Sequence, residues 1–411
     1  MRSEKGFVIF SWALYDLANQ FFALNVVSLY FPRWLMIEKG APEILYSITF
    51  GLSMFLVAVC APLLGALSDE KGRRRYFLVL FTLISVLFTM GLGLSSGIFL
   101  GLVCFAIANF GCQEAIVFYN ALMVEVAPKG RIGLVSGMGR MFGYTGAILA
   151  LYLTKPVMYR MGYQAAFLVT GILFFIFSLP CLIFVKETRH GRTGVPAGPG
   201  KKKDLLRVFR EIIETLLRKD KFTDLKAFLR ASFFVLCAIN TMLIFMAIYA
   251  GKVFGLDEGK IIDLIAFSTL FAIVGSIISG FISDIIGLKK AMLGVFSLWG
   301  ICVLAGGLLY APFHWLVGAL VGISLGGTWV VFRALVIRLV PEESVGEAFG
   351  LFNLVGYLAG ITGPLIWGLI LMGLSRYGEQ GYRVSFLSLL VFIVIGIILL
   401  LRLKDTAACG K

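Results

Sequence analysis

Charged residues are scarce in this sequence. Only 15% of its 411 residues are Asp, Glu, Lys or Arg, and 59% are hydrophobic, whereas a soluble domain is about a quarter charged and just under half apolar. A water-soluble protein of this size has no surface for so many apolar side chains, so the composition excludes a soluble enzyme and a disordered chain. The net charge of +14 is interpreted as loop charge beside lipid, and no nucleic-acid partner is predicted.

Histidines and paired cysteines are equally scarce. The chain has two histidines, and its seven cysteines form no C-x-x-C pair, which argues against a zinc site and against a disulfide framework. His190 falls in a loop and His314 at the opposite water interface, so neither can serve a Ser or Cys nucleophile. No Walker-type phosphate loop is present. We therefore predict no catalytic residue, no metal and no cofactor, and the protein is not expected to be an enzyme.

Long apolar runs dominate instead, and twelve of them can cross about 30 Å of hydrocarbon as helices. They cover residues 7–31, 46–68, 76–96, 98–123, 132–154, 164–185, 228–250, 261–283, 291–310, 313–337, 346–372 and 383–403. Twelve spans place both termini on one side of the membrane. Most of the 37 Lys and Arg residues fall on that side, which the positive-inside rule makes cytoplasmic.

The middle loop, residues 187–227, is the one large hydrophilic segment. It begins with a Gly- and Pro-containing linker, and then DLLRVFREIIETLLR places its Leu, Ile, Val and Phe residues on one helical stripe. This pattern predicts an amphipathic helix on the inner membrane surface. Its role is either a strap between two halves of the chain or regulation, and the strap is favoured.

A loop motif occurs twice, which indicates a duplication. Gly65 and Asp69 precede a basic run containing Arg73, and the same G-x3-D-x2-G pattern follows the eighth span. The segments around Pro128 and Pro341 repeat at nearly the same offset. We predict two six-span bundles, residues 1–186 and 228–411, whose loops form a polar clasp, with ordinary basic turns as the alternative. The candidate gating residues are Gly65, Asp69, Arg73, Glu125, Asp284 and Lys289.

The twin loops on twelve spans resemble the major facilitator superfamily. Within it, the first-span segment W-A-L-Y-D-L-A-N, residues 12–19, is similar to the W-x-x-Y-D-x-A-N signature of the family of fungal vacuolar amino-acid effluxers and their bacterial relatives. The resemblance implies an all-α membrane protein with the major facilitator fold, and it suggests an amino acid as the first guess for the substrate.

Three ionisable residues fall inside the spans of the N-terminal half. Asp16, Glu114 and Arg140 each lie about eight or nine residues from the cytoplasmic end of a span, so at 1.5 Å per residue they share one depth. Such groups need a partner or an aqueous cavity. We expect one wet pocket in which Arg140 keeps one acid ionised while desolvation and like-charge repulsion favour a proton on the other. The alternative is a static ion network that orients the helices.

Polar and aromatic residues on the same helical faces complete the candidate substrate and proton-coupling site. In the N-terminal half they are Trp12, Tyr15, Asp16, Asn19, Gln113, Glu114, Asn120, Arg140 and Tyr144. In the C-terminal half they are Asn240, Trp329 and Arg333.

The sequence thus predicts a monomeric, proton-coupled secondary transporter of a small polar or zwitterionic solute in the cytoplasmic membrane. Repeated halves around a midplane site are the design expected for alternating access. Alternatives are an exporter of amphiphiles or drugs, which the apolar C-terminal half would suit, and a lipid scramblase or sensor on the same scaffold. A scramblase would need no ion gradient, and a sensor would be expected to carry a soluble signalling domain.

Overall fold

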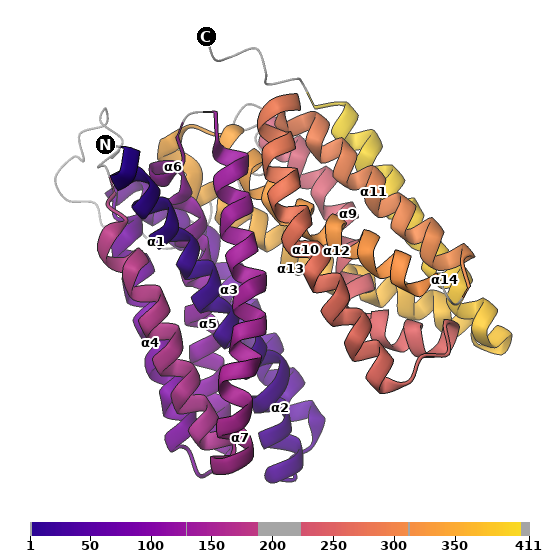
Figure 1. Ribbon diagram of the computed structural model, residues 1–411, viewed down its shortest axis with the longest axis horizontal. Helices are drawn as coiled ribbons and strands as arrows, with labels where there is room; N and C mark the ends of the chain where they lie inside the picture. Colours follow the sequence, from indigo (N-terminus) through magenta and orange to yellow (C-terminus); the bar gives the residue numbers. More distant parts are fainter. Residues whose placement is uncertain (1, 129, 188–222, 311–312, 404–411) are drawn as a thin grey trace. The chain divides into compact units, whose positions relative to one another are not determined.

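The computed structural model describes the chain except for residues 1, 129, 188–222, 311–312 and 404–411, and the described part is helical (Figure 1). The amphipathic helix predicted in the middle loop lies outside the described residues. Contacts divide the chain into two compact units. Unit 1 is Met1–Ile212 with Pro341–Leu351, and unit 2 is Ile213–Val340 with Phe352–Lys411.

Unit 1 contains the first six predicted spans. Its helices are α1 (Arg2–Gln20), α2 (Phe31–Arg33), α3 (Glu43–Lys71), α4 (Arg74–Leu94), α5 (Ile98–Ala121), α6 (Met123–Val126) and α7 (Ile132–Phe184), with π-helical segments η1 (Phe21–Tyr30) and η2 (Trp34–Glu38) after α1. The short η3 (Glu342–Ser344) and the first turns of α13 (Val345–Gly373) also belong to this unit. Helix α13 therefore begins in unit 1 and continues into unit 2.

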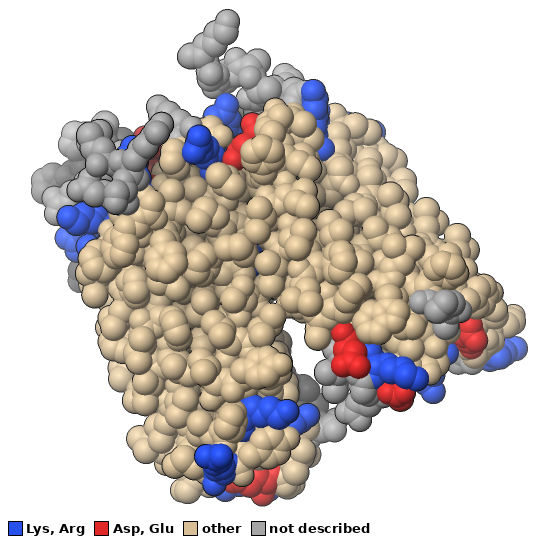
Figure 2. All heavy atoms as spheres, in the orientation of Figure 1, with Lys and Arg blue, Asp and Glu red and all other residues tan. Residues whose placement is uncertain are grey.

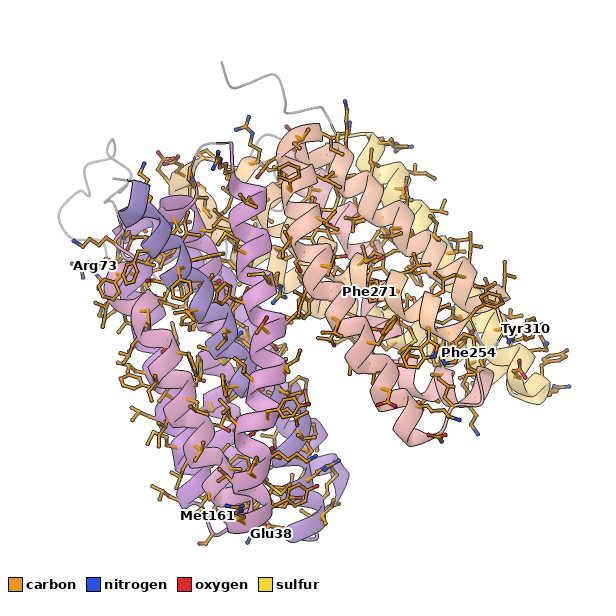
Figure 3. The ribbon with its side chains drawn as sticks, in the orientation of Figure 1. Glu38, Arg73, Met161, Phe254, Phe271 and Tyr310 are labelled. Carbon is orange, nitrogen blue, oxygen red and sulfur yellow. The ribbon has the colours of Figure 1, made fainter. Side chains whose placement is uncertain are left out.

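Helix α7 holds two predicted spans. It is 53 residues long, and its backbone breaks at Gly162, where φ is 83° and only glycine is unstrained. The chain reverses there: Thr154, before the break, and Tyr163, just after it, both contact Tyr30, and Thr170 lies back beside Asn25. Met161, at the break, lies with Glu38 at the end of the unit opposite Arg73 (Figure 3). The two halves of α7 thus cross the unit separately, and counted separately they give twelve candidate membrane segments, the number predicted.

Unit 2 contains the last six predicted spans except for the start of the eleventh, and close glycine contacts hold its helices together. Its helices are α9 (Thr223–Val253), α10 (Glu258–Ile286), α11 (Leu288–Leu308), α12 (His314–Arg338), the rest of α13, η4 (Ser375–Tyr377) and α14 (Gly378–Leu401). A Cβ at Gly322 or Gly326 of α12 would lie 2.1 or 2.2 Å from a carbonyl oxygen of α10. Because any side chain would force the helices apart, these glycines set the α10–α12 spacing, as in other membrane bundles.

The helix flanks are apolar and the helix ends are charged. Among the described residues, eleven helices, the long α7 counted once, are long and apolar enough to cross a membrane. On the face drawn in Figure 2, Lys, Arg, Asp and Glu side chains gather at the ends of each bundle. Large apolar side chains such as Phe55, Leu87 and Ile361 are exposed on the flanks. In water this surface would be unstable, whereas against lipid it is the expected solution.

Candidate functional site

An ion pair joins α1 to the first half of α7. Arg140 Nη1 lies 3.5 Å from Asp16 Oδ1; the Asp16 carboxylate is almost fully buried, whereas the Arg140 side chain keeps 18% of its surface. The helices can approach here because glycines follow Arg140 on α7. A Cβ at Gly146 would lie 2.5 Å from the carbonyl oxygen of Leu17. The structure therefore brings together the two charges predicted for spans one and five.

Arg140 is the accessible member of the pair. Its guanidinium also lies 5.9 Å from the ring centroid of Tyr144, one turn further along α7, and Tyr144 is half-buried. A guanidinium holds a carboxylate by charge and by a planar fork of N–H donors. A second carboxylate that reached Arg140 could therefore compete with Asp16 for the same donors, which gives the pair the chemistry of an anion or zwitterion site.

The aromatic residues of the first-span segment on α1 have a different role. Trp12 Nε1 donates to the Tyr119 carbonyl at 3.1 Å, and the Tyr15 hydroxyl lies 2.7 Å from Thr82 Oγ1. The Tyr119 ring stacks on both Trp12 and Tyr15, with centroids 4.6 and 4.8 Å apart. All three aromatic residues are buried. Trp12 and Tyr15 thus hold α1 against α4 and α5, and they present no surface to a solute in this structure.

Asn19, the last polar residue of the first-span segment, also contacts α5. Cys112 Sγ donates to Asn19 Oδ1 at 2.8 Å, and both residues are buried. Neither Thr82 nor Cys112 can be recognised from the sequence, because a lone Thr or Cys in an apolar run carries no sign of the partner that it meets across the bundle.

Glu114 lies apart from the Asp16–Arg140 pair. Its side chain is completely buried on α5, and neither carboxyl oxygen has a hydrogen-bond partner among the described residues. Its electrostatic neighbour is Cys60 of α3. The expectation that all three charges meet in one cluster therefore fails for Glu114. Helical rise predicts the depth of Glu114, but it does not predict which neighbouring helix the side chain meets, because each residue along a helix changes the direction of its side chain by about 100°.

The remaining N-terminal candidates flank these groups. Gln113 is half-buried, and Asn120 is buried with no partner for its Oδ1 among the described residues. Asn109, three turns before Asn120, donates to Ser53 Oγ on α3 at 2.8 Å. Asn109 and Glu114 therefore place two buried polar groups along the α3–α5 contact.

The C-terminal candidates lie in unit 2, Asn240 on α9 and the other two on α12. Asn240 Nδ2 donates to the Gly356 carbonyl at 3.4 Å, which ties α9 to α13. On α12, Trp329 is half-buried and Arg333 is buried. The adjacent Thr328 hydroxyl accepts from Trp299 Nε1 at 2.7 Å, a helix-to-helix contact that the sequence did not reveal.

The first loop motif forms a buried clasp within unit 1. Asp69 Oδ1 accepts from Arg74 Nε at 2.7 Å, and Asp69 Oδ2 accepts from the backbone N–H of Glu347 at 2.8 Å. The carboxylate thus occupies the N-terminus of α13, where free N–H groups and the helix dipole favour an anion. Gly65 permits the contact, since its Cβ would lie 2.4 Å from the Gly346 carbonyl oxygen. The structure thus places Gly65 and Asp69, two of the candidate gating residues, at this contact.

The basic member of the clasp differs from the predicted one. Arg73 is exposed (labelled in Figure 3), and its neighbour Arg74 is buried and forms the ion pair. Gly72 ends α3 with φ at 56°, and this turn decides which of three consecutive arginines points inward. Because the sequence motif does not fix the turn geometry, it could not identify Arg74. Glu125 lies half-buried in α6.

Residues of both loop motifs also form hydrogen bonds with the end of the last helix of their own unit. Glu187 accepts from the backbone N–H groups of Arg74 and Arg75 at 2.9 and 3.0 Å, and Arg75 donates to the Leu182 carbonyl. In unit 2, Lys289 donates to the carbonyls of Leu401 and Leu403 at the end of α14. The basic side chains thus satisfy terminal carbonyls, while Asp284 is half-buried.

Comparison with known proteins agrees with this architecture. Residues 43–408 match the family described as vacuole effluxer Atg22 like. The chain belongs to this family. An uncharacterized MFS-type transporter of Bacillus subtilis, YxiO, is 28% identical over 413 residues, covering 95% of this chain and 93% of that protein.

Two solved transporter structures share this fold, and one of them is described as a protein of the major facilitator superfamily (MFS). The human organic anion transporter MFSD10 superposes with a TM-score of 0.74 at 16% identity, covering 97% of this chain and 99% of that one. The proton:xylose symporter XylE gives 0.73 at 13% identity, with both chains covered completely. This Atg22-like protein is thus a multi-pass MFS-type membrane transporter, and the predicted family and fold are confirmed.

Proposed function

We propose that this transporter moves a small polar or zwitterionic solute, in the first instance an amino acid, by alternating access coupled to protons. The Asp16–Arg140 ion pair carries the proposal. A buried pair of opposite charges is weak evidence for a purely stabilising role, because desolvation offsets much of the attraction. Inside a membrane such a pair is more often a substrate or ion site.

The geometry of the pair favours a zwitterion. A free amino acid carries a carboxylate and an ammonium a short distance apart, and Arg140 and Asp16 offer the complementary charges 3.5 Å apart. On binding, the solute carboxylate replaces Asp16 at the guanidinium and the ammonium replaces Arg140 at the carboxylate. No charge is then left unpaired, which is the condition for binding at low dielectric.

We further propose that the clasp at Asp69 acts as the gate. Its carboxylate joins the end of α3 to the first turns of α13, a helix that continues into unit 2. Loss of this contact would free the start of α13, as alternating access requires. We also propose that the protein acts as a monomer in the cytoplasmic membrane, with both termini and the middle loop cytoplasmic.

Thermal stabilisation of the purified protein tests the solute class. The panel contains the proteinogenic amino acids, dipeptides, organic anions and cationic amphiphiles, each at two pH values. A ligand at one hundred times its Kd stabilises the folded state by about 2.7 kcal/mol. We expect amino-acid stabilisation of the wild type and of Lys155→Met, an exposed charge on the same helix, and none of Arg140→Met.

Other outcomes identify other functions. Stabilisation by amphiphiles alone, unchanged in Arg140→Met, would reject the zwitterion site and favour an exporter of amphiphiles. Lipid redistribution in vesicles without any ion gradient would instead favour a scramblase.

A further inference from the structure

Glu114 is a buried acid with no counter-ion. Its exposure is zero and neither Oε1 nor Oε2 has a hydrogen-bond partner among the described residues. An ionised carboxylate in such a place would be strongly disfavoured, because it has lost water and gained no donor. The neutral carboxylic acid is therefore the form that this packing accommodates. Asp16 differs, because Arg140 is its counter-ion.

Glu114 lies in a polar seam between α3 and α5. We define this seam by Ser53 and Cys60 of α3 and by Asn109 and Glu114 of α5. The Asn109 amide donates to Ser53, and an ionised Glu114 would act electrostatically on the Cys60 thiol. Two residues beyond Cys60, Pro62 interrupts the hydrogen bonding of α3. A proline removes one N–H and loosens or bends the helix. Of the two helices that form the seam, α3 is therefore the one that can bend.

The same part of α3 supports the start of α13. A Cβ at Gly350 would lie 2.6 Å both from the Ala61 carbonyl oxygen and from Pro62 Cα. The two backbones are therefore in direct contact immediately after Cys60. One turn earlier on α13, the Glu347 N–H donates to Asp69. Helix α13 thus rests on α3 at two points, and the first of them directly follows Cys60 of the seam.

We propose that the protonation state of Glu114 controls how firmly α13 docks on α3, so that Glu114 carries the coupling proton. When Glu114 is neutral, the seam stays dry and α13 remains docked. Loss of the proton to water leaves a carboxylate that must be hydrated, so α3 separates from α5 at Cys60–Pro62. The backbone contact at Gly350 has no side chain that could adjust, and α13 undocks. Rebinding of a proton reverses the change.

This inference rests on the proposed function only for the identity of the coupled ion, and its test needs no solute. Other titratable groups on these helices and on the adjoining elements must be separated from Glu114. They are Cys60 and Asp69 of α3, Arg74 of α4, Tyr15 and Asp16 of α1, Tyr119 of α5, Glu342 and Glu343 of η3, and Glu347 of α13.

Amide hydrogen exchange of Val345–Leu351 in the purified full-length protein measures docking. After division by the intrinsic exchange rate at each pH, we expect opening in the wild type to rise with pH, approaching about tenfold per pH unit where one group titrates. In Glu114→Gln, which stays neutral, the corrected rate should be slow at every pH. In Asp69→Asn it should be faster throughout but should still rise with pH. A Glu114→Gln variant that keeps the wild-type pH profile would overturn the proposal.

Infrared spectroscopy of the wild type is a second test of the proposal, and it does not depend on whether Glu114→Gln folds. At low pH the wild type should show a carbonyl stretch from a protonated buried carboxyl group, which disappears over the pH range in which the α13 amides open. Absence of this band, or its loss without any change in α13 exchange, would contradict the proposal. A solute panel without a binder would reject the proposed substrate class and leave these results unaffected.

Discussion

Removing the charge of Asp16 or of Arg140 should reveal an attraction between them that is stronger than that of a surface ion pair. At 3.5 Å and an effective dielectric constant of about 20, two unit charges attract by about 5 kcal/mol. Desolvation offsets part of this energy, but removal of one partner from a buried pair still costs about 3–5 kcal/mol, because the other charge remains buried and unpaired. The 18% exposure of Arg140 places the expected loss for Asp16→Asn or Arg140→Met near the lower end, about 3 kcal/mol.

A double-mutant cycle measures this interaction. The free energy of unfolding is obtained by titrating the purified protein from mild detergent into a denaturing detergent. The double variant, which leaves no charge behind, should be at least about 1 kcal/mol more stable than the sum of the single losses predicts. Lys155→Met, an exposed cation on α7, should change little and should not couple to Asp16→Asn. Single losses that add within about 0.5 kcal/mol would refute the claim that the two charges interact.

Three further predictions concern the contacts around this pair and the clasp. Asp69→Asn removes the charge at the N-terminus of α13, so the amide of Glu347 should exchange at least about fivefold faster, corresponding to about 1 kcal/mol; an unchanged rate would contradict the clasp. Gly146→Val should prevent normal packing of α1 on α7 and abolish monodisperse expression, whereas Gly368→Ala, with open space around it, should be tolerated. Tyr15→Phe should lower the unfolding free energy by only about 1 kcal/mol, and a larger loss would mean that the hydroxyl does more than bond to Thr82.

Sequence reasoning succeeded where a single helix decides the outcome. Apolar runs located the twelve membrane segments, because lipid demands long helices whatever their neighbours are. The first-span segment and the twin loops indicated the family. The G-x3-D pattern correctly placed Gly65 and Asp69 at a close helix contact, since a small residue one turn before a carboxylate suits approach to a helix terminus.

It failed where the rotation of two helices decides which side chains meet. Glu114 and Arg140 were predicted at equal depth, but α5 turns Glu114 toward Cys60 and away from the α1–α7 contact. Arg74 replaces Arg73 in the clasp because of the left-handed turn at Gly72. The capping of α4 by Glu187 joins residues more than one hundred positions apart, and the local sequence contains no signal for such a contact.

The location of a bound solute tests the central claim most directly. An experimental structure with the amino acid that best stabilises the protein should show the solute carboxylate on the guanidinium of Arg140 and the solute ammonium at Asp16, with the direct contact between these side chains replaced. A solute bound elsewhere in the chain, with the two side chains still in contact as they are here, would contradict the account.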